Sequence, residues 1–321
     1  MTKLTPKSQS ETARQIGLGR LWLAGLAPNT RGAIWMLGSA LAFTLMTALV
    51  KFLGAGYSAS VQTFYRQAAA LLVLLPMMAR DWRGSFHSTK PWILLFRSSA
   101  GTLAMTLGFY AFQKLPLADA NALSFTRTLW LVPLAGFVLG EKLGPLRIGA
   151  SVVGFLGVLV MLRPTGSSAA FGLPQAAALG SAFLFALTIA GMKVLTRDHK
   201  PFTLLVWSSA LGLVFSIPMA LLSWRWPSLT DLGLLITMGV LGVLAQACYI
   251  KGMQIGDAAA MAPIDYMRLV FAVAVGFLVF HDVPQLATLI GAAVVVCSTL
   301  FITWREARDN RRAAAMIDAV D

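Results

Sequence analysis

Charged side chains are scarce in this chain of 321 residues: they make up 12% of it, and only 13 residues are acidic. A soluble domain typically carries about 25% charged residues, so this chain has too few to cover a water-exposed surface. Hydrophobic residues make up 57% of the chain, and its mean hydropathy is +0.73. The composition therefore predicts an integral membrane protein.

The chain also has few of the residues that build metal sites and disulfide frameworks. It contains two cysteines, both within apolar stretches, and three histidines, all between such stretches. The sequence has no Walker A motif, no HExxH and no GxSxG, which argues against ATP-driven pumping and hydrolytic chemistry. We therefore expect no cofactor, no metal site and no enzymatic activity.

The net charge of +13 raises the question of whether the chain binds nucleic acid. However, the basic residues lie in short loops and tails between apolar stretches. No nucleic-acid-binding module is visible, so membrane topology explains this charge better. Residues 1–31 form a basic N-terminal arm whose apolar patch, residues 21–27, is too short to span a bilayer. We expect this arm to be cytosolic.

Ten apolar stretches have about the length that a membrane-spanning helix needs, roughly 20 residues. Turn residues and charges separate them, and they lack the alternating pattern of barrel strands, so helices are the expected structure. The stretches run over residues 32–52, 60–78, 91–112, 117–139, 146–162, 171–195, 202–222, 229–252, 258–280 and 283–304.

The chain repeats itself across its midpoint. Residues 38–51 (GSALAFTLMTALVK) and 180–193 (GSAFLFALTIAGMK) align without a gap and are identical at seven positions. Two similar halves of five helices each predict an inverted repeat, because an odd number makes the second half enter from the opposite face. The expected fold is an all-α integral membrane protein, whose ten transmembrane helices form two inverted five-helix repeats. These repeats occupy residues 32–164 and 171–304, and a cytosolic tail follows over residues 305–321.

Basic residues orient these helices. Most lysines and arginines outside the stretches collect on the side of the N-terminus, whereas the opposite side keeps Lys51, Lys114, Arg163 and Arg225. Cytosolic loops carry the excess of basic residues in membrane proteins, so both termini are expected in the cytoplasm. The predicted location is the inner (plasma) membrane.

Several segments together resemble a known family. LPLADANALSFT (115–126), LGE (139–141) and GFLGVLVMLRP (154–164) look like the first repeat of EamA-like transporters in the drug/metabolite transporter superfamily. APIDYMRL (262–269), GFLVFHD (276–282) and WREAR (304–308) are similar to the second repeat. The resemblance implies two EamA domains, a central cavity and movement of small metabolites without ATP hydrolysis. The chain departs from the family at residues 281–282, His-Asp, where the family often has Gly-Glu.

Four arginines fall inside apolar stretches: Arg66, Arg97, Arg127 and Arg268. A charge at the centre of a membrane helix costs about 2.5–3.5 kcal/mol on insertion scales, and arginine does not shed its proton. Each must therefore face a partner, water or a ligand. We expect structural or gating roles for four residues: Arg66, Arg97, Glu141 and Asp282.

Arg127 and Arg268 hold matching positions in the two halves, because each precedes an acid, Glu141 or Asp282, by the same spacing. An inverted two-fold axis would bring them toward a common central site. Asp265 precedes Arg268 by one helical turn, so the two can pair on one helix face. Either Asp265 neutralises Arg268 and Arg127 bonds a backbone carbonyl, or at least one arginine contacts the substrate. The remaining alternatives are an arginine that reaches a lipid headgroup and a misplaced helix. Asp265 is also a candidate proton-coupling carboxylate.

The substrate-binding residues expected at this centre are Arg127, Arg268, Asp265, Tyr266, Tyr110 and Trp35. The aromatic rings can stack a planar substrate, although aromatic residues in membrane helices also serve packing. An unpaired arginine presents a fork of donors that suits a carboxylate, a phosphate or an imide carbonyl. The expected substrate therefore has an anionic or strongly accepting group, like an amino acid, a vitamin such as riboflavin, or an S-adenosylmethionine-like compound.

These features together predict a secondary transporter, a permease or an exporter, that moves a small organic metabolite by alternating access. The alternatives are a membrane-embedded enzyme and a channel or structural membrane protein. The expected partners are a small-molecule substrate and membrane lipid, with a homodimer left open and no nucleic acid. Substrate identity, direction of transport and coupling ion stay open at this level.

Overall fold

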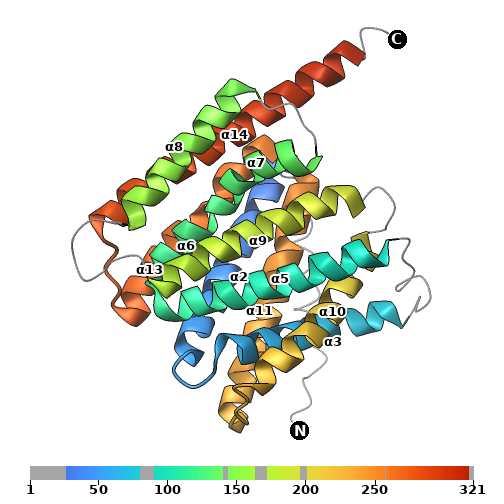
Figure 1. The fold of residues 1–321 in the computed structure, drawn as a ribbon, viewed down its shortest axis with the longest axis vertical. Helices are drawn as coiled ribbons and strands as arrows, with labels where there is room; N and C mark the ends of the chain where they lie inside the picture. The colour runs from blue at the N-terminus through green and yellow to red at the C-terminus, as the bar shows by residue number, and fades with distance from the viewer. Residues whose placement is uncertain are drawn as a thin grey trace, which may run out of the picture.

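Helices make up every regular element that the structure, a computed structural model, describes (Figure 1). The described residues are 27–79, 90–139, 144–162, 172–195, 201–256 and 258–317. Within them, seven helices are long and apolar enough to cross a membrane. A further apolar segment, Ile148–Leu162, is shorter. The prediction of an all-helical membrane protein is confirmed.

The helices follow the apolar stretches of the sequence. In the first half they are α2 (Pro28–Leu53), α3 (Ala59–Met78), α5 (Pro91–Lys114), α6 (Leu117–Ser124), α7 (Thr126–Leu139) and α8 (Pro145–Leu162). In the second half they are α9 (Leu173–Leu195), α10 (Pro201–Leu221), α11 (Leu229–Ile255), α12 (Ala258–Asp265), α13 (Met267–Phe280) and α14 (Leu286–Ile317). The last helix continues into the charged tail, for which we expected only a cytosolic segment.

Two of the predicted helices are broken. The stretch 117–139 forms α6 and α7 with a break at Phe125, and the stretch 258–280 forms α12 and α13 with a break at Tyr266. At each break, the backbone N–H bonds the carbonyl three positions back, from Phe125 to Ala122 (3.2 Å) and from Tyr266 to Pro263 (3.3 Å). The two breaks are separated along the chain by the same offset as Arg127 and Arg268, so they hold equivalent positions in the two halves.

Side-chain hydrogen bonds and a proline accompany these breaks. Before the first, Asn121 and Ser124 bond backbone carbonyls through their side chains, and just after it the Thr126 hydroxyl bonds the Leu123 carbonyl at 2.7 Å. Such bonds offer the backbone an alternative to the regular helical ladder. Before the second break stands Pro263, which has no N–H to donate and crowds the preceding turn.

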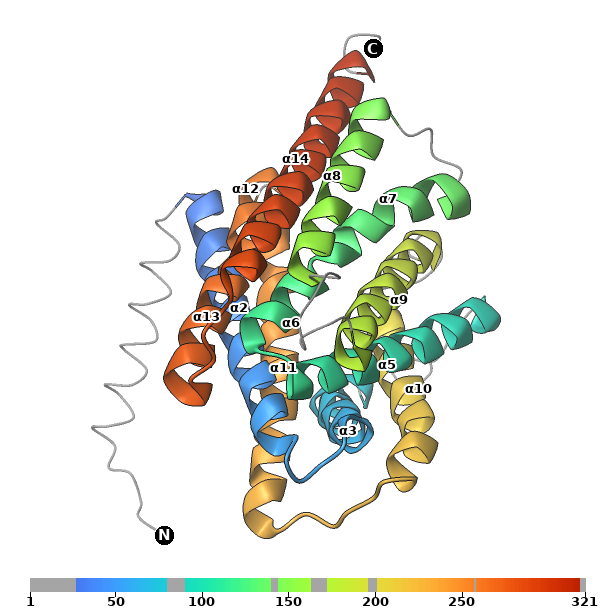
Figure 2. The same cartoon turned by 60° about the vertical axis from the view of Figure 1, so that its left-hand side comes forward.

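The two halves of the chain pack against each other through their first helices. Helix α2 lies along α11, and α9 lies along α5, so each half places its first helix against the other half (Figure 2). Close approach depends on glycine: a Cβ at Gly252 of α11 would lie 3.1 Å from the Gly32 carbonyl oxygen of α2. Helices α8 and α14 run side by side, and a Cβ at Gly157 would lie 2.9 Å from the Gly291 carbonyl oxygen. Small residues at helix crossings are typical of membrane proteins.

Candidate functional site at two helix breaks

Four of the residues expected in a central site lie at the two helix breaks. Arg127 is the second residue of α7, directly after the break at Phe125. Asp265 ends α12, Tyr266 occupies the second break, and Arg268 lies in the first turn of α13. The structure thus brings together residues that are far apart in sequence and come from both halves of the chain.

One carboxylate serves two guanidinium groups. Asp265 Oδ2 forms a close ion pair with Arg268 Nη2, and it lies 3.4 Å from Arg127 Nη2. Arg268 Nε also donates to the Asp265 backbone carbonyl at 3.2 Å. Asp265 therefore pairs with both arginines, a combination that none of the sequence interpretations contained. With all three groups ionised, the cluster has one positive charge in excess.

The two arginines differ in how firmly they are held. Arg268 is buried at 6% exposure, and its guanidinium lies between the rings of Phe43 and Phe125, at 4.9 and 5.2 Å from their centroids. Stacking of this kind holds a guanidinium in place through attraction to the ring faces. The Arg127 side chain is 28% exposed and makes only the longer contact to Asp265 among those described. Arg127 is therefore the arginine with donors to offer a ligand.

Tyr266 connects this cluster to α14. Its ring packs against Phe125 with centroids 4.6 Å apart, and its hydroxyl forms a hydrogen bond with Thr299 Oγ1. Thr299 is fully buried and donates to the Val296 carbonyl at 3.0 Å. The bond between the Tyr266 and Thr299 hydroxyls, in which either oxygen can donate, holds the ring against α14.

Sequence reasoning missed three residues of this site: Phe43, Phe125 and Thr299. Phe43 carried a usable signal, because it is one of the identical positions of the repeat and corresponds to Phe185. Phe125 corresponds to Tyr266 at the offset of the two arginines, and this too is readable from the sequence. Thr299 had no such signal, since only the packing of α14 brings it to Tyr266.

Two aromatic residues expected in the site lie elsewhere or make other contacts. Trp35 of α2 lies under the Lys251 ammonium, which is 5.1 Å from its ring centroid, and so it forms a cation–π pair with α11. Tyr110 of α5 is half-buried and packs against the main apolar core. No described contact joins either ring to Asp265.

Arg66 and Arg97 make their described contacts with other groups than Asp265. Arg66 Nη1 donates to the Gln67 side chain at 2.9 Å, and glycine at position 242 leaves room for its Nε. Arg97 Nη1 donates to the Ser208 hydroxyl of α10. The structural or gating roles that we expected for both residues stay a prediction. Glu141, the other expected gating residue of the first half, lies outside the described residues.

Asp282 lies at the far end of α13 from the cluster, where it forms an ion pair with Lys51 of α2. It also accepts a hydrogen bond from the backbone N–H of Leu117 at 3.3 Å, at the start of α6. Asp282 therefore joins the second half to two helices of the first.

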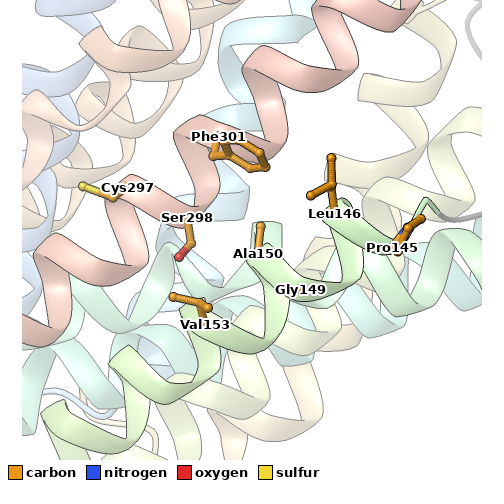
Figure 3. A pocket seen from close by; sticks show the side chains of 8 residues that line it. All are labelled: Pro145, Leu146, Gly149, Ala150, Val153, Cys297, Ser298 and Phe301. Carbon is orange, nitrogen blue, oxygen red and sulfur yellow. The ribbon is translucent and has the colours of Figure 1, made fainter.

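A hollow of about 380 Å³ lies between α8 and α14 (Figure 3), and no residue of the arginine cluster lines it. Its lining is apolar apart from the side chains of Cys297 and Ser298. Within the described part of the chain, no group of three or more metal-ligating side chains comes together. The charged cluster at the helix breaks is therefore the stronger candidate for recognition of a polar ligand.

Apolar helices of membrane-spanning length around buried charges define the class: a multi-pass, all-helical membrane protein. The profile of the EamA-like transporter family matches residues 30–163 and again residues 173–304. The chain therefore belongs to the EamA-like transporter family, and it has two copies of the EamA domain. It is a secondary transporter of a small metabolite and not an enzyme.

Curated relatives match almost their whole length. The riboflavin transporter of Vibrio cholerae serotype O1 is 30% identical over 287 residues, which cover 88% of this chain and 96% of the relative. The S-adenosylmethionine uptake transporter of Rickettsia prowazekii is 28% identical, covering 86% and 93%. The pseudopaline exporter of Pseudomonas aeruginosa is 26% identical, covering 81% and 92%. A crystal structure that is 16% identical shares the fold at a TM-score of 0.60, covering 87% of this chain and 98% of its own.

Proposed function

We propose that this protein moves a small organic metabolite with an anionic or strongly accepting group across the plasma membrane by alternating access. In this proposal the two EamA domains are inverted five-helix repeats, with both termini in the cytoplasm, and they rock around the arginine cluster. The pairing of α2 with α11 and of α9 with α5 supports two equivalent halves, because each contact has a counterpart in the other. The positions of the basic residues support the orientation.

The observation that carries the proposal is the contact between Arg127 and Asp265. Arg127 belongs to the first EamA domain and Asp265 to the second, so a ligand that binds Arg127 acts on the junction of the two. The excess positive charge of the cluster favours an anionic or strongly accepting group. The low dielectric of a membrane protein interior strengthens this preference.

In this proposal Arg127 is the substrate ligand, and Arg268 is a positioning residue that holds Asp265 on the second domain. Tyr266 and Phe125 supply aromatic surface beside the guanidinium groups. S-adenosylmethionine and riboflavin are the first compounds to test, because relatives that transport them match nearly the full chain. The first has a carboxylate and the second an imide, and both are acceptors that an arginine fork can bind.

The test is counter-flow in proteoliposomes, after a thermal-shift screen of a metabolite panel that includes both compounds. Arg127→Gln should lower uptake at least tenfold, because it removes a charge-assisted donor worth about 1.5–3 kcal/mol. Arg225→Gln is the matched control, since Arg225 is exposed in the loop before α11. Transport that Arg127→Gln leaves unchanged would refute the site. Flux that does not saturate and shows no counter-flow would refute a carrier and point to a channel.

A further inference from the structure

The pair Lys51–Asp282 joins three helix ends at one face of the protein. Lys51 lies in the last turn of α2, and Asp282 follows α13. Because Asp282 also accepts a hydrogen bond from the N–H of Leu117, one carboxylate connects the end of α2, the start of α6 and the end of α13. The first two helices belong to the first EamA domain and the third belongs to the second.

The local backbone holds Asp282 in this position. His281 adopts the left-handed conformation at φ 57°, and the Asp282 N–H donates to the Gly276 carbonyl at 3.0 Å. This is the usual way for a helix to stop, although glycine normally occupies the left-handed position. The Lys51 ammonium lies 4.9 Å from the centroid of the Phe280 ring. The side chains of Lys51 and Asp282 are only 15% and 20% exposed.

Two further contacts close the same face between the domains. The Tyr57 hydroxyl, in the loop after α2, donates to Asp231 Oδ2 at 2.8 Å in the first turn of α11. Ser58, at the cap of α3, lies within hydrogen-bond distance of Ser223 after α10, with 2.6 Å between their hydroxyl oxygens. Both contacts join residues of the first domain to residues of the second.

This face is well separated from the arginine cluster. Helix α13 has 14 residues, so Asp282 lies about 20 Å from the break at Tyr266 at a rise of about 1.5 Å per residue. Helix α6, with 8 residues, covers about 12 Å from Leu117, at the ion pair, to Ser124, beside the cluster. Helices α6 and α13 therefore both extend from the cluster to the helix ends that Lys51 and Asp282 hold together.

We propose that the Lys51–Asp282 pair is the latch that closes the central site at this face and that breaks when the site opens there. The proposal rests on the proposed function, because a latch has meaning only for a carrier with alternating access. In the proposed orientation this face is periplasmic, so the structure corresponds to a state closed to the periplasm.

An ion pair suits such a latch. A partly buried pair gains from mutual attraction and loses hydration, and these contributions nearly cancel. When the face opens, both groups recover their hydration, so breaking the pair costs little net free energy. An apolar contact of the same extent would lose its favourable burial on opening.

The experiment measures access to a thiol beside the cluster. Ser124→Cys places it one residue before Phe125, in a background of Cys248→Ser and Cys297→Ser that removes both native thiols. A membrane-impermeant maleimide is added to cells, and to inverted vesicles for the opposite side. From the face of Lys51, labelling should be slow in the parent and five- to tenfold faster with Lys51→Gln or Asp282→Asn. Lys51→Arg and the control Lys114→Gln, at the exposed end of α5, should leave the parent rate unchanged.

A charge exchange separates the latch from a merely structural role. Lys51→Asp combined with Asp282→Lys should return labelling toward the parent rate, because the attraction is restored with opposite polarity. Unchanged labelling in both single variants would overturn the latch, and so would a double variant that labels as fast as they do. A failure of the proposed function alone gives a different result. Labelling then responds as described, while counter-flow is absent in the parent for every compound of the panel.

Discussion

Replacing Asp265 by asparagine should destabilise the protein strongly, because it removes the only carboxylate that the structure describes between Arg127 and Arg268. At 3.4 Å and an effective dielectric constant of about 20, the Arg127 contact alone is worth about 5 kcal/mol before desolvation is subtracted. The net cost of removing one member of a buried pair is about 3–5 kcal/mol. Asparagine keeps the volume, so the loss arises from charge.

The assay is thermal unfolding of the purified protein in detergent. A chain of this size shifts its midpoint by about 2 °C per kcal/mol, so Asp265→Asn should lower the midpoint by about 6–10 °C. Arg127→Gln should lower the free energy of unfolding less in the Asp265→Asn background than in the parent. In that background it removes a cation that has already lost its partner. Residues that interact directly typically show a coupling energy of about 0.5 kcal/mol or more.

Two results would refute this reasoning. If Asp265→Asn unfolds at the parent midpoint, the carboxylate does not compensate the arginines, and water or lipid must solvate them. If the losses of unfolding free energy in the two single variants sum to the loss in the double variant within about 0.5 kcal/mol, Arg127 and Asp265 do not interact in solution. The second result would also remove the observation on which the proposed function rests.

Two further predictions test the surroundings of the cluster. Thr299→Val keeps the shape of the side chain but removes the hydroxyl that bonds Tyr266, and we expect a loss of about 1 kcal/mol with a weaker apparent affinity for substrate, measured by counter-flow. Thr303→Val on the same helix is the control, and equal effects would argue against a role in the site. Gly157→Leu should destabilise by about 1–3 kcal/mol in thermal unfolding, because its Cβ would lie 2.9 Å from the Gly291 carbonyl oxygen; Gly149→Leu, with open space around it, should not.

Much of the fold follows from the sequence because membrane insertion leaves few choices. Apolar length sets the helices, and charges and turn residues set their limits, so the expected and observed ranges agree for helices such as α2 and α11. The breaks at Phe125 and Tyr266 did not follow from length, because hydropathy does not register a local change of hydrogen bonding. Hydroxyl and amide side chains surround Phe125, and Pro263 precedes Tyr266, but similar residues also occur within unbroken helices such as α3 and α10.

The candidate site was also predictable only in part: sequence patterns indicated some of its contacts, and helix packing determines the others. The repeat predicted that Arg127 and Arg268 approach one another, and sequence spacing predicted the pair of Asp265 with Arg268. The shared use of Asp265 was not predictable, because it depends on the angle between α7 and α12. From the sequence, Lys51 was expected only on the face opposite the N-terminus; its partner Asp282 lies 231 residues away, a contact that no local pattern indicates.

The difference between the two repeats accounts for the charge of the site. At the offset that relates Arg127 to Arg268 and Phe125 to Tyr266, the position of Asp265 is taken by Ser124. Duplication thus supplied two arginines at equivalent breaks, and only one of them has an acid one helical turn before it. Two acids would neutralise both arginines and leave nothing for an anionic substrate. No acid at all would leave two like charges facing each other inside the membrane, where even a single unpaired charge is costly. One acid stabilises the pair and still leaves Arg127 with donors to offer, which is the condition that the proposed substrate-binding role of Arg127 requires.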